Sequence, residues 1–390
     1  MPPPLLITPE TARRFLRRAL HFDTPAPTVA AALAYYGFIQ IDPINVCGRM
    51  HDLILRNRVT GYCEGDLHAH IHATDLALRR LGEVGRPGFE HYYPDAGILV
   101  AFPSDAWPYL APLIANRRLR RGAAYRRKLS PKHEALAQHI LAEIAARGPL
   151  TSNDIEHEGQ SVTGWGSVGR LVKNLLEVMF VHGRVLITAR KNFRRVYDLP
   201  ERVLPASLLN APPKSGAEIA RWTALLRLRQ RRLVILKRAE LPLVADLVQQ
   251  VEIDGVKTPP LHCLHSDLPL LDLSTLNSSP RRNSAKAGQL STPATAPLLL
   301  APLDPLIYDR RLTSALWGYD YTWEVYTPPA KRTRGYYALP VLAGTEIIGH
   351  VDPKADREAR RLRVMARSIR RGHKVAPAVK ELAAFLGLRA

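Results

Sequence analysis

The pattern of hydrophobic and polar positions is most distinctive over Phe38–Pro43, where isoleucines alternate with polar residues. In an extended strand, the side chains at positions i and i+2 point to the same face. The pattern therefore predicts a short strand with Ile39 and Ile41 on one face. Gln40 and Asp42 share the other face, about 6–7 Å apart.

Helical patterns surround this strand. Thr8-Pro9-Glu10 is a typical helix start, and a second helix is predicted over about 28–36, ending at Gly37. After Pro43, apolar residues recur at helical spacings, which predicts a further helix capped by Asp42. Helices around one short strand are compatible with a winged helix. We therefore assign 1–129 to an N-terminal winged helix with an irregular extension.

The segment 130–205 has the most regular pattern. A helix is predicted to start at Ser130-Pro131, and 148–155 has the pattern of a turn followed by the start of a second helix. A third helix is predicted over about 168–180, and the strands 184–187 and 194–197 form a hairpin. Three helices and a two-stranded wing predict a second winged helix.

The C-terminal half is less regular. A basic helix opens 216–273, which we interpret as a divergent third winged helix, and 274–296 has the composition of a linker. The segment 297–390 is predicted to be a β-rich domain with terminal helices. The predicted fold class is thus α+β, with tandem winged-helix domains and a small β-barrel-like domain at the C-terminus.

Four elements are predicted within that C-terminal domain. The segments 323–326 and 336–342 form a long hairpin, and a strand covers 347–351. A helix with a basic face runs from 354 to 371, and a packed helix around Leu382 closes the chain.

The charge of the chain indicates a polyanionic partner. Its 390 residues carry 55 Lys and Arg against 35 Asp and Glu, a formal net charge of +20 and a pI of about 10.2. Arginine predominates, and its planar fork binds two phosphate oxygens. Because the wing of a winged helix lies along the DNA backbone, the predicted modules make double-stranded DNA the expected partner. The candidate contacts are Arg49, His51, Arg117, Arg118, Arg120, Arg121, Arg126, Arg127, Lys191, Arg194, Arg195, Lys331, Arg332 and Arg334. Each charged run is also compatible with an ordinary solvated face.

Other classes of protein fit less well. Three cysteines without metal-ligand spacing argue against a disulfide framework and indicate a reducing compartment. No stretch approaches 18 apolar residues, and the N-terminus lacks the pattern of a signal peptide. We expect a cytoplasmic, nucleoid-associated monomer that uses no metal and no cofactor.

Gln40 and Asp42 are the strongest candidates for chemistry. An amide beside a carboxylate can hold and polarise one water molecule, which suffices for hydrolysis when the leaving group departs easily. The alternative is structural, with Asp42 serving only as the cap of a helix that begins at Pro43. Asn45 and His91 are candidates for a supporting role behind this pair, and for His91 the alternative is an ordinary core histidine.

A set of short motifs, taken in order, resembles one known family. They are Gly37–Asp42, Phe89-Glu90-His91, Asp95-Ala96, Ser130–Glu134, Val196–Leu199, Leu303–Arg311, Tyr319-Asp320-Tyr321, Lys331-Arg332, Gly335-Tyr336-Tyr337 and Val351–Arg357. Together they span nearly the whole chain. The sequence is similar to the YcaQ-like bacterial DNA glycosylases, called AlkX, which are related to AlkZ and have the HTH-42 tandem winged-helix fold.

The resemblance implies a monofunctional DNA glycosylase. Such enzymes excise cationic N-alkylpurines, N7-alkylguanine and N3-alkyladenine, and unhook interstrand crosslinks. Gln40 and Asp42 match the family's Gln-apolar-Asp motif, so Asp42 is expected to stabilise an oxocarbenium-like transition state and activate water, which Gln40 positions. The alternative is a non-catalytic winged-helix transcription regulator.

Two departures from the family pattern bear on the substrate. Pro94 stands where the second motif has a histidine. Gly164–Gly169 replaces a Trp pair and a Lys that relatives carry in the third helix of the central module. The preferred lesion, a small alkyl adduct or a crosslink, is therefore left open.

Overall fold

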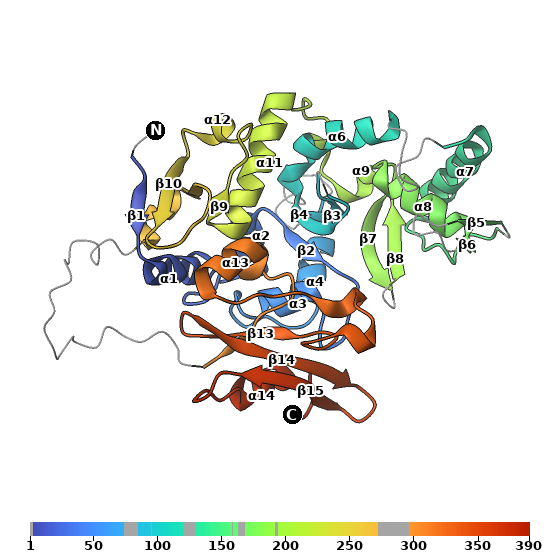
Figure 1. Ribbon diagram of the computed structural model, residues 1–390. Helices are drawn as coiled ribbons and strands as arrows, with labels where there is room; N and C mark the ends of the chain where they lie inside the picture. Colours follow the sequence, from blue (N-terminus) through green and yellow to red (C-terminus); the bar gives the residue numbers. More distant parts are fainter. Residues whose placement is uncertain are drawn as a thin grey trace, which may run out of the picture. The chain divides into compact units, whose positions relative to one another are not determined.

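The computed structural model describes residues 3–73, 85–94, 96–119, 129–157, 159–162, 168–191, 194–271 and 296–390 (Figure 1). The chain forms two compact units. Unit 1 contains Met1–Tyr36, Asp42–Asp66 and Ala224–Ala390, and unit 2 contains Gly37–Ile41 and Leu67–Thr223. The chain therefore passes from unit 2 to unit 1 between Ile41 and Asp42.

Unit 1 begins with strand β1 (Leu5–Ile7) and two helices, α1 (Pro9–Ala19) and α2 (Val29–Tyr36). The hydroxyl of Thr8 accepts a hydrogen bond from the Thr11 amide at 3.1 Å and caps α1, with proline at the first helical position. Gly37 follows α2 with a φ of +77°, a conformation that favours glycine. Both predicted helices are confirmed.

The predicted helix after Pro43 starts later than expected. Helix α3 covers Met50–Leu55, and Arg49 is its N-cap residue. Residues 43–49 form turns instead, with Gly48 at a φ of +118° and its amide bonded to Asn45 Oδ1 at 3.1 Å. Helix α4 (Asp66–His72) follows. The prediction that Asp42 caps a helix is therefore wrong.

A four-stranded sheet joins the N-terminus to the middle of the chain. Its order is β1-β10-β11-β9, with β10 at Val248–Ile253, β11 at Leu261–Leu264 and β9 at Val234–Ile235. Strand β1 pairs parallel with β10, and the other pairs are antiparallel. Helices α11 (Gly216–Arg231) and α12 (Leu241–Val244) complete this part, and α11 begins in unit 2.

The C-terminal sheet has the order β12-β13-β14-β15, with all pairs antiparallel. Its strands are β12 (Leu298–Leu299), β13 (Leu339–Ala343), β14 (Glu346–Asp356) and β15 (Arg361–Ile369), drawn in orange to red in Figure 1. Helices α13 (Arg310–Trp317) and α14 (Ala376–Phe385) accompany it. The sheet is open, so the barrel-like closure that we expected is not found among the described strands.

One core unites α3, this sheet and α14. Met50 and Leu53 of α3, Val341 of β13, Val351 of β14 and Leu382 of α14 are all fully buried in one cluster. The terminal helix is thus confirmed. The loop that begins at Asp42 leads directly into the helix that covers this sheet.

Two predicted elements of the C-terminal domain are wrong. The segment 323–326 holds a 3-10 helix, Glu324–Tyr326, instead of a strand, so it forms no hairpin with β13. The segment 354–371 forms the second half of the β14–β15 hairpin instead of a helix. Backbone pairing with β14 outweighs the helix propensity of its arginines, and Leu362 is the only residue of β15 that is buried.

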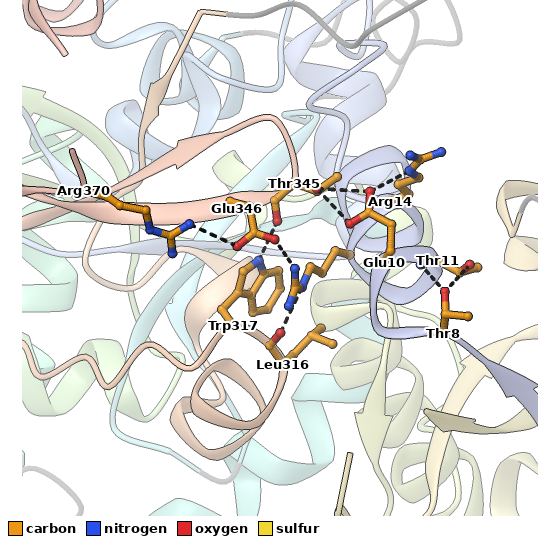
Figure 2. A network of polar contacts seen from close by, with 10 residues as sticks. Thr8, Glu10, Thr11, Arg14, Leu316, Trp317, Thr345, Glu346 and Arg370 are labelled. Atoms are coloured by element: carbon orange, nitrogen blue, oxygen red, sulfur yellow. Dashed lines mark hydrogen bonds and ion pairs between the residues drawn. The ribbon is translucent and has the colours of Figure 1, made fainter. Parts of the chain in front are cut away.

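Side chains fasten α1 to the C-terminal sheet (Figure 2). Thr345 donates its hydroxyl hydrogen to Glu10 Oε2 at 3.1 Å, and the Trp317 indole donates to the Thr345 carbonyl at 2.8 Å. Arg13 bonds to the Leu316 carbonyl at 2.9 Å and pairs with Glu346. These contacts bring the two ends of the chain into one unit.

Unit 2 contains the sheet β2-β4-β3, with β2 at Ile39–Ile41, β4 at Leu99–Pro103 and β3 at Gly88–Tyr92. The strand predicted at Gln40 is confirmed. Helix α6 (Trp107–Leu119) follows β4 after the short 3-10 turn Ser104–Ala106. Strand β2 pairs antiparallel with the central strand β4.

The predicted second winged helix agrees with the structure only in part. Helix α7 (Pro131–Arg147) and the hairpin of β7 (Leu186–Lys191) and β8 (Arg194–Asp198) form as expected. Helix α8 covers Leu171–Val181 and starts later than predicted, because a small hairpin of β5 (Gln160–Val162) and β6 (Val168–Arg170) precedes it. No helix forms in the described residues between 148 and 162.

The core of this module is apolar. Ile140 of α7, Leu175 of α8 and Ile187 of β7 pack together. The short helices α9 (Pro200–Val203) and α10 (Ala206–Leu209) follow. The predicted domain boundaries stay predictions, and 274–295 of the predicted linker lies outside the described residues. No helix in the described part of the chain has the length and apolar character to cross a bilayer.

Candidate active site

Gln40 lies in the middle of β2, opposite Val100 of β4. It is 9% exposed, while Ile39 and Ile41 are 2% and 6% exposed, so the strand is buried on both faces. Buried amides are usually hydrogen-bonded. No side-chain hydrogen bond joins Gln40 to any other described residue, which leaves its amide available for a water or a ligand.

Asp42 follows β2 directly and is the first residue of the second segment of unit 1, Asp42–Asp66. Its side chain is half-buried, and Oδ1 accepts a hydrogen bond from the Ile44 amide at 2.9 Å. This contact makes a local turn in which the carboxylate mimics a backbone carbonyl. Among the described residues, Oδ2 has no hydrogen-bond partner. The carboxylate is therefore oriented by one oxygen while the other stays available.

Burial raises the pKa of Asp42 above its usual 3.8, and the hydrogen bond from Ile44 offsets part of this rise. A partly desolvated carboxylate interacts more strongly with a nearby positive charge than a hydrated one. The electrostatics of Asp42 therefore suit the stabilisation of a cation.

The loop after Asp42 is tied to the C-terminal hairpin. The Ala355 amide donates to the Val46 carbonyl at 2.9 Å, and Arg357 donates to Asn45 Oδ1 at 3.3 Å. Asn45 is exposed and also accepts from the Gly48 amide. The structure thus gives Asn45 a role in shaping this loop, and its predicted supporting role in catalysis stays a prediction.

Tyr337 is a neighbour for which the sequence predicted no role. Its side chain is fully buried, and its hydroxyl has no hydrogen-bond partner among the described residues. Burial raises the pKa of Tyr337, and the charges of Cys47 and Asp42 raise it further. The motif Gly335-Tyr336-Tyr337 was the only signal in the sequence that could have singled it out.

His51 does not fit its predicted contact with DNA. It is 0% exposed in α3, and its Nε2 lies 3.6 Å from Oδ2 of Asp52. Asp52 in turn accepts hydrogen bonds from the Tyr62 hydroxyl and the Gly65 amide. His51 therefore belongs to an internal polar cluster. Arg49, half-buried at the start of α3, stays a predicted contact.

His91 and Arg117 form another internal cluster. His91 is fully buried, with Nε2 2.9 Å from the Phe180 carbonyl and Nδ1 3.2 Å from Arg117. Burial, with the charge of Arg117, lowers the pKa of His91 to about 3. This geometry is that of a core histidine. Arg117 is 4% exposed and also bonds to the Tyr93 carbonyl, so it does not fit its predicted contact with DNA.

The cations of the β7–β8 hairpin divide into two kinds. Lys191 and Arg194 are exposed beside the hairpin turn. Arg195 pairs with Glu177 of α8 and lies over the ring of Phe180, 5.5 Å from its centre. Arg195 therefore holds β8 on α8 and does not fit its predicted phosphate contact, whereas Lys191 and Arg194 stay candidates.

The segment between the strands predicted at 323–326 and 336–342 carries Lys331, Arg332 and Arg334. It forms a loop with a 3-10 turn at Pro329–Lys331. The carboxylate of Glu324 accepts the amides of Thr333, Arg334 and Gly335. Arg334 donates to the Asp320 carbonyl at 2.6 Å.

Of the three cations of this loop, only one is available to bind a phosphate without first breaking a described contact. Arg332 donates to the Thr327 carbonyl and stacks on Tyr336. Only Lys331 projects without a described contact. The remaining predicted cations lie outside the described side chains: Arg118, Arg120, Arg121, Arg126 and Arg127.

Glu90 is a buried charge whose role the sequence did not predict. It is fully buried in β3, where it pairs with Arg190 of β7. His72 and His68 of α4 approach Oε1 at 3.2 and 3.6 Å. Glu90 therefore links the sheet that carries Gln40 to the β7–β8 hairpin.

Within the described residues, no group of three or more His, Cys, Asp or Glu side chains is placed to hold a metal ion. The three cysteines are free, with Cys47 and Cys263 buried and Cys63 exposed.

Comparison with known proteins identifies the family. The model of the family described as DNA glycosylase AlkZ-like matches residues 33–387, which include Gln40 and Asp42. Among solved structures, the Streptomyces sahachiroi DNA glycosylase AlkZ is similar over 97% of this chain and 98% of that chain, with a TM-score of 0.55 and 12% sequence identity. At this identity the likeness establishes a shared mixed α/β fold. The family match covers most of the sequence, and the chain therefore belongs to the AlkZ-like DNA glycosylases, enzymes that hydrolyse N-glycosidic bonds.

Proposed function

We propose that this enzyme is a monofunctional glycosylase that releases cationic N-alkylpurines, N7-alkylguanine and N3-alkyladenine, from double-stranded DNA and unhooks interstrand crosslinks. The observation that carries the proposal is the state of Asp42. Its carboxylate is half-buried and oriented by the Ile44 amide, and its second oxygen has no described partner.

The chemistry needs only one carboxylate. An alkylated purine already carries a positive charge, so the bond from C1′ to the base nitrogen breaks with its electron pair neutralising the base. The sugar becomes cationic, as in glycoside hydrolysis. Asp42 stabilises this cation and accepts the proton of the water that attacks C1′.

Gln40 positions that water. It is two residues from Asp42, so their Cα atoms are at most about 7 Å apart. Its buried amide has no described side-chain hydrogen bond, and a water held there would satisfy it. The amide donates to or accepts from the water while the carboxylate takes the proton.

DNA would be held by a tandem winged-helix arrangement. The β7–β8 hairpin serves as a wing, with Lys191 and Arg194 on the phosphate backbone. Arg49 and Lys331 are further phosphate contacts. A crosslinked base cannot swing out of the duplex, so an open arrangement suits it better than a closed base pocket. A monomer is sufficient for this task.

Release of N7-methylguanine from a duplex tests the proposal. Asp42→Asn keeps an oxygen that can accept from the Ile44 amide but removes the charge. We expect a loss of activity of at least about a hundredfold with an unchanged melting temperature. Gln40→Leu should reduce the rate less.

Asp66→Asn is a matched control. Its carboxylate also accepts a backbone amide, that of Cys63 at 2.7 Å, in an exposed turn. This variant should keep full activity. A wild-type protein that releases no base from any cationic lesion, and instead binds one operator sequence tightly, would favour a transcription regulator.

A further inference from the structure

The end of the β14–β15 hairpin and the residues that follow it carry an unusual concentration of positive charge. Residues 354–374 contain nine Lys and Arg against two acids, Asp356 and Glu358. All nine cationic side chains are exposed. We call these nine side chains the basic strip.

Few of these charges are compensated within the protein. Arg363 pairs with Asp356 at 2.7 Å, and Arg357 pairs with Glu64 at 3.6 Å. Figure 2 shows the third pair, Arg370 with Glu346, at 3.7 Å. The other six cations make no ion pair with any described residue. Glu346 is shared, because it also pairs with Arg13. The strip thus retains a large positive charge.

The strand register brings like charges together. Arg363 of β15 lies directly opposite Lys354 of β14. Directly opposed residues of an antiparallel pair share one face, and like charges there are destabilising. A chain could avoid this cost with a neutral residue at either position. An anion that binds both cations would offset it.

The exposed apolar residues of β15 argue against a surface that contacts only solvent. Val364 and Met365 are 41% and 60% exposed between the arginines. Met365 has no partner on β14, because the register shifts at this point from Val364↔Pro353 to Ala366↔Asp352. Cations with apolar side chains between them match a sugar–phosphate backbone, in which apolar sugar surface separates the phosphates.

The strip starts beside the loop that carries Asp42. The Ala355 amide bonds to the Val46 carbonyl, and Arg357 bonds to Asn45. All of these residues belong to unit 1. The first cations of the strip therefore adjoin the loop that carries Asp42.

We propose that the basic strip binds the sugar–phosphate backbone of the double-stranded DNA that flanks the lesion. This inference rests on the proposed function for its choice of ligand. The strip contributes affinity that is independent of sequence, and it takes no part in breaking the glycosidic bond.

The salt dependence of binding tests this proposal. The strip variant combines Arg361→Gln, Arg363→Gln and Arg367→Gln in one chain. Its binding constant K is measured for an undamaged duplex of about 20 base pairs, which is two helical turns. The slope of log K against log salt should become shallower by about 2 to 3, since each lost phosphate contact contributes about 0.9. The loss should be the same for unrelated duplex sequences.

A control variant removes the same charge from the same unit. Arg238, Lys257 and Arg311 are exposed cations outside the strip. Their joint replacement by Gln should change the slope by less than about 0.5. Equal slopes for the strip variant and the wild type would overturn the proposal. Binding of an acidic protein to the strip would not rescue it, because the proposed ligand is DNA. Equal losses for the two variants would also overturn it, because the effect would then reflect net charge alone.

Base release separates this proposal from the proposed function. At saturating enzyme, the single-turnover rate of N7-methylguanine release should be the same in the strip variant and the wild type. If the wild type releases no base, the proposed function is wrong, but the difference in salt slope would still show whether the strip binds DNA. A strip variant with normal binding and a reduced rate would refute the assignment to binding.

Discussion

The ion pair between Arg58 and Asp304 makes the sharpest prediction about stability. Both side chains are 0% exposed, and Arg58 donates to both carboxylate oxygens, at 2.9 and 2.6 Å. The guanidinium also bonds to the Ile54 carbonyl and lies 4.3 Å from the ring centre of Phe22. The pair therefore joins the turn that follows α3 to the start of the C-terminal domain.

Asp304→Asn would leave the guanidinium buried without a counter-charge. Removing one partner of a buried pair costs about 3–5 kcal/mol, because the desolvation of the other charge is no longer compensated. Asp304 Oδ1 also accepts the Leu306 amide at 2.9 Å, and the Asn oxygen can keep that bond. The predicted loss thus reports the charge. It is a large share of a total stability of about 5–15 kcal/mol.

Thermal unfolding followed by circular dichroism measures this loss. At about 2–4 °C per kcal/mol, the melting temperature should fall by roughly 6–20 °C. Asp309→Asn is the matched control, because Asp309 caps α13 through the Arg311 and Leu312 amides and pairs with no described cation. Asn caps as well as Asp, so this variant should lose no more than about 0.5 kcal/mol. Similar losses for the two variants would refute the reasoning.

Two further predictions concern pH. Burial raises the pKa of Asp42, and only its ionised form stabilises the cation. The single-turnover rate should therefore fall as the pH is lowered, with a midpoint above 3.8. A rate that stays constant down to that pH would contradict the assignment of Asp42. Burial alone would raise the pKa of Glu90, but hydrogen bonds and charge from His72 and Arg190 outweigh it and lower the pKa below its usual 4.5. Its ionised form therefore stabilises the fold above about pH 4.5, and this contribution is lost on acidification. Urea unfolding at a series of pH values should show a smaller loss of stability in acid for Glu90→Gln than for the wild type, and an equal loss would contradict the role of Glu90.

Local signals in the sequence predicted the elements that depend on local physics. A capping threonine with a following proline marked α1, Gly37 marked the end of α2, and alternation marked β2. The β14–β15 hairpin could not be predicted in this way, because arginine favours helices and the strand exists only through pairing with a partner earlier in the chain.

The burial of the candidate site residues was partly visible in the sequence. Arg117 follows Leu110 and Ile114 at spacings of seven and three residues on α6, so it lies on the same buried stripe. That periodicity could have excluded it as a phosphate contact. Every residue of α3 is buried, so no periodicity distinguishes His51 from an exposed residue. The Asp42 turn has no sequence signal that separates it from a helix cap, because Asp-Pro is typical of both.

These corrections change how the net charge of the chain should be understood. Three arginines form hydrogen bonds or ion pairs with carboxylates or carbonyls inside the protein: Arg58, Arg117 and Arg195. Their charges stabilise the fold and are largely screened from a ligand. A count of cations therefore overstates the number of phosphate contacts. The charge that can attract DNA is the part left exposed and uncompensated, and among the described residues it is concentrated on the basic strip. The position of exposed charge is thus a better predictor of where the DNA backbone binds than the number of cations in any run of sequence.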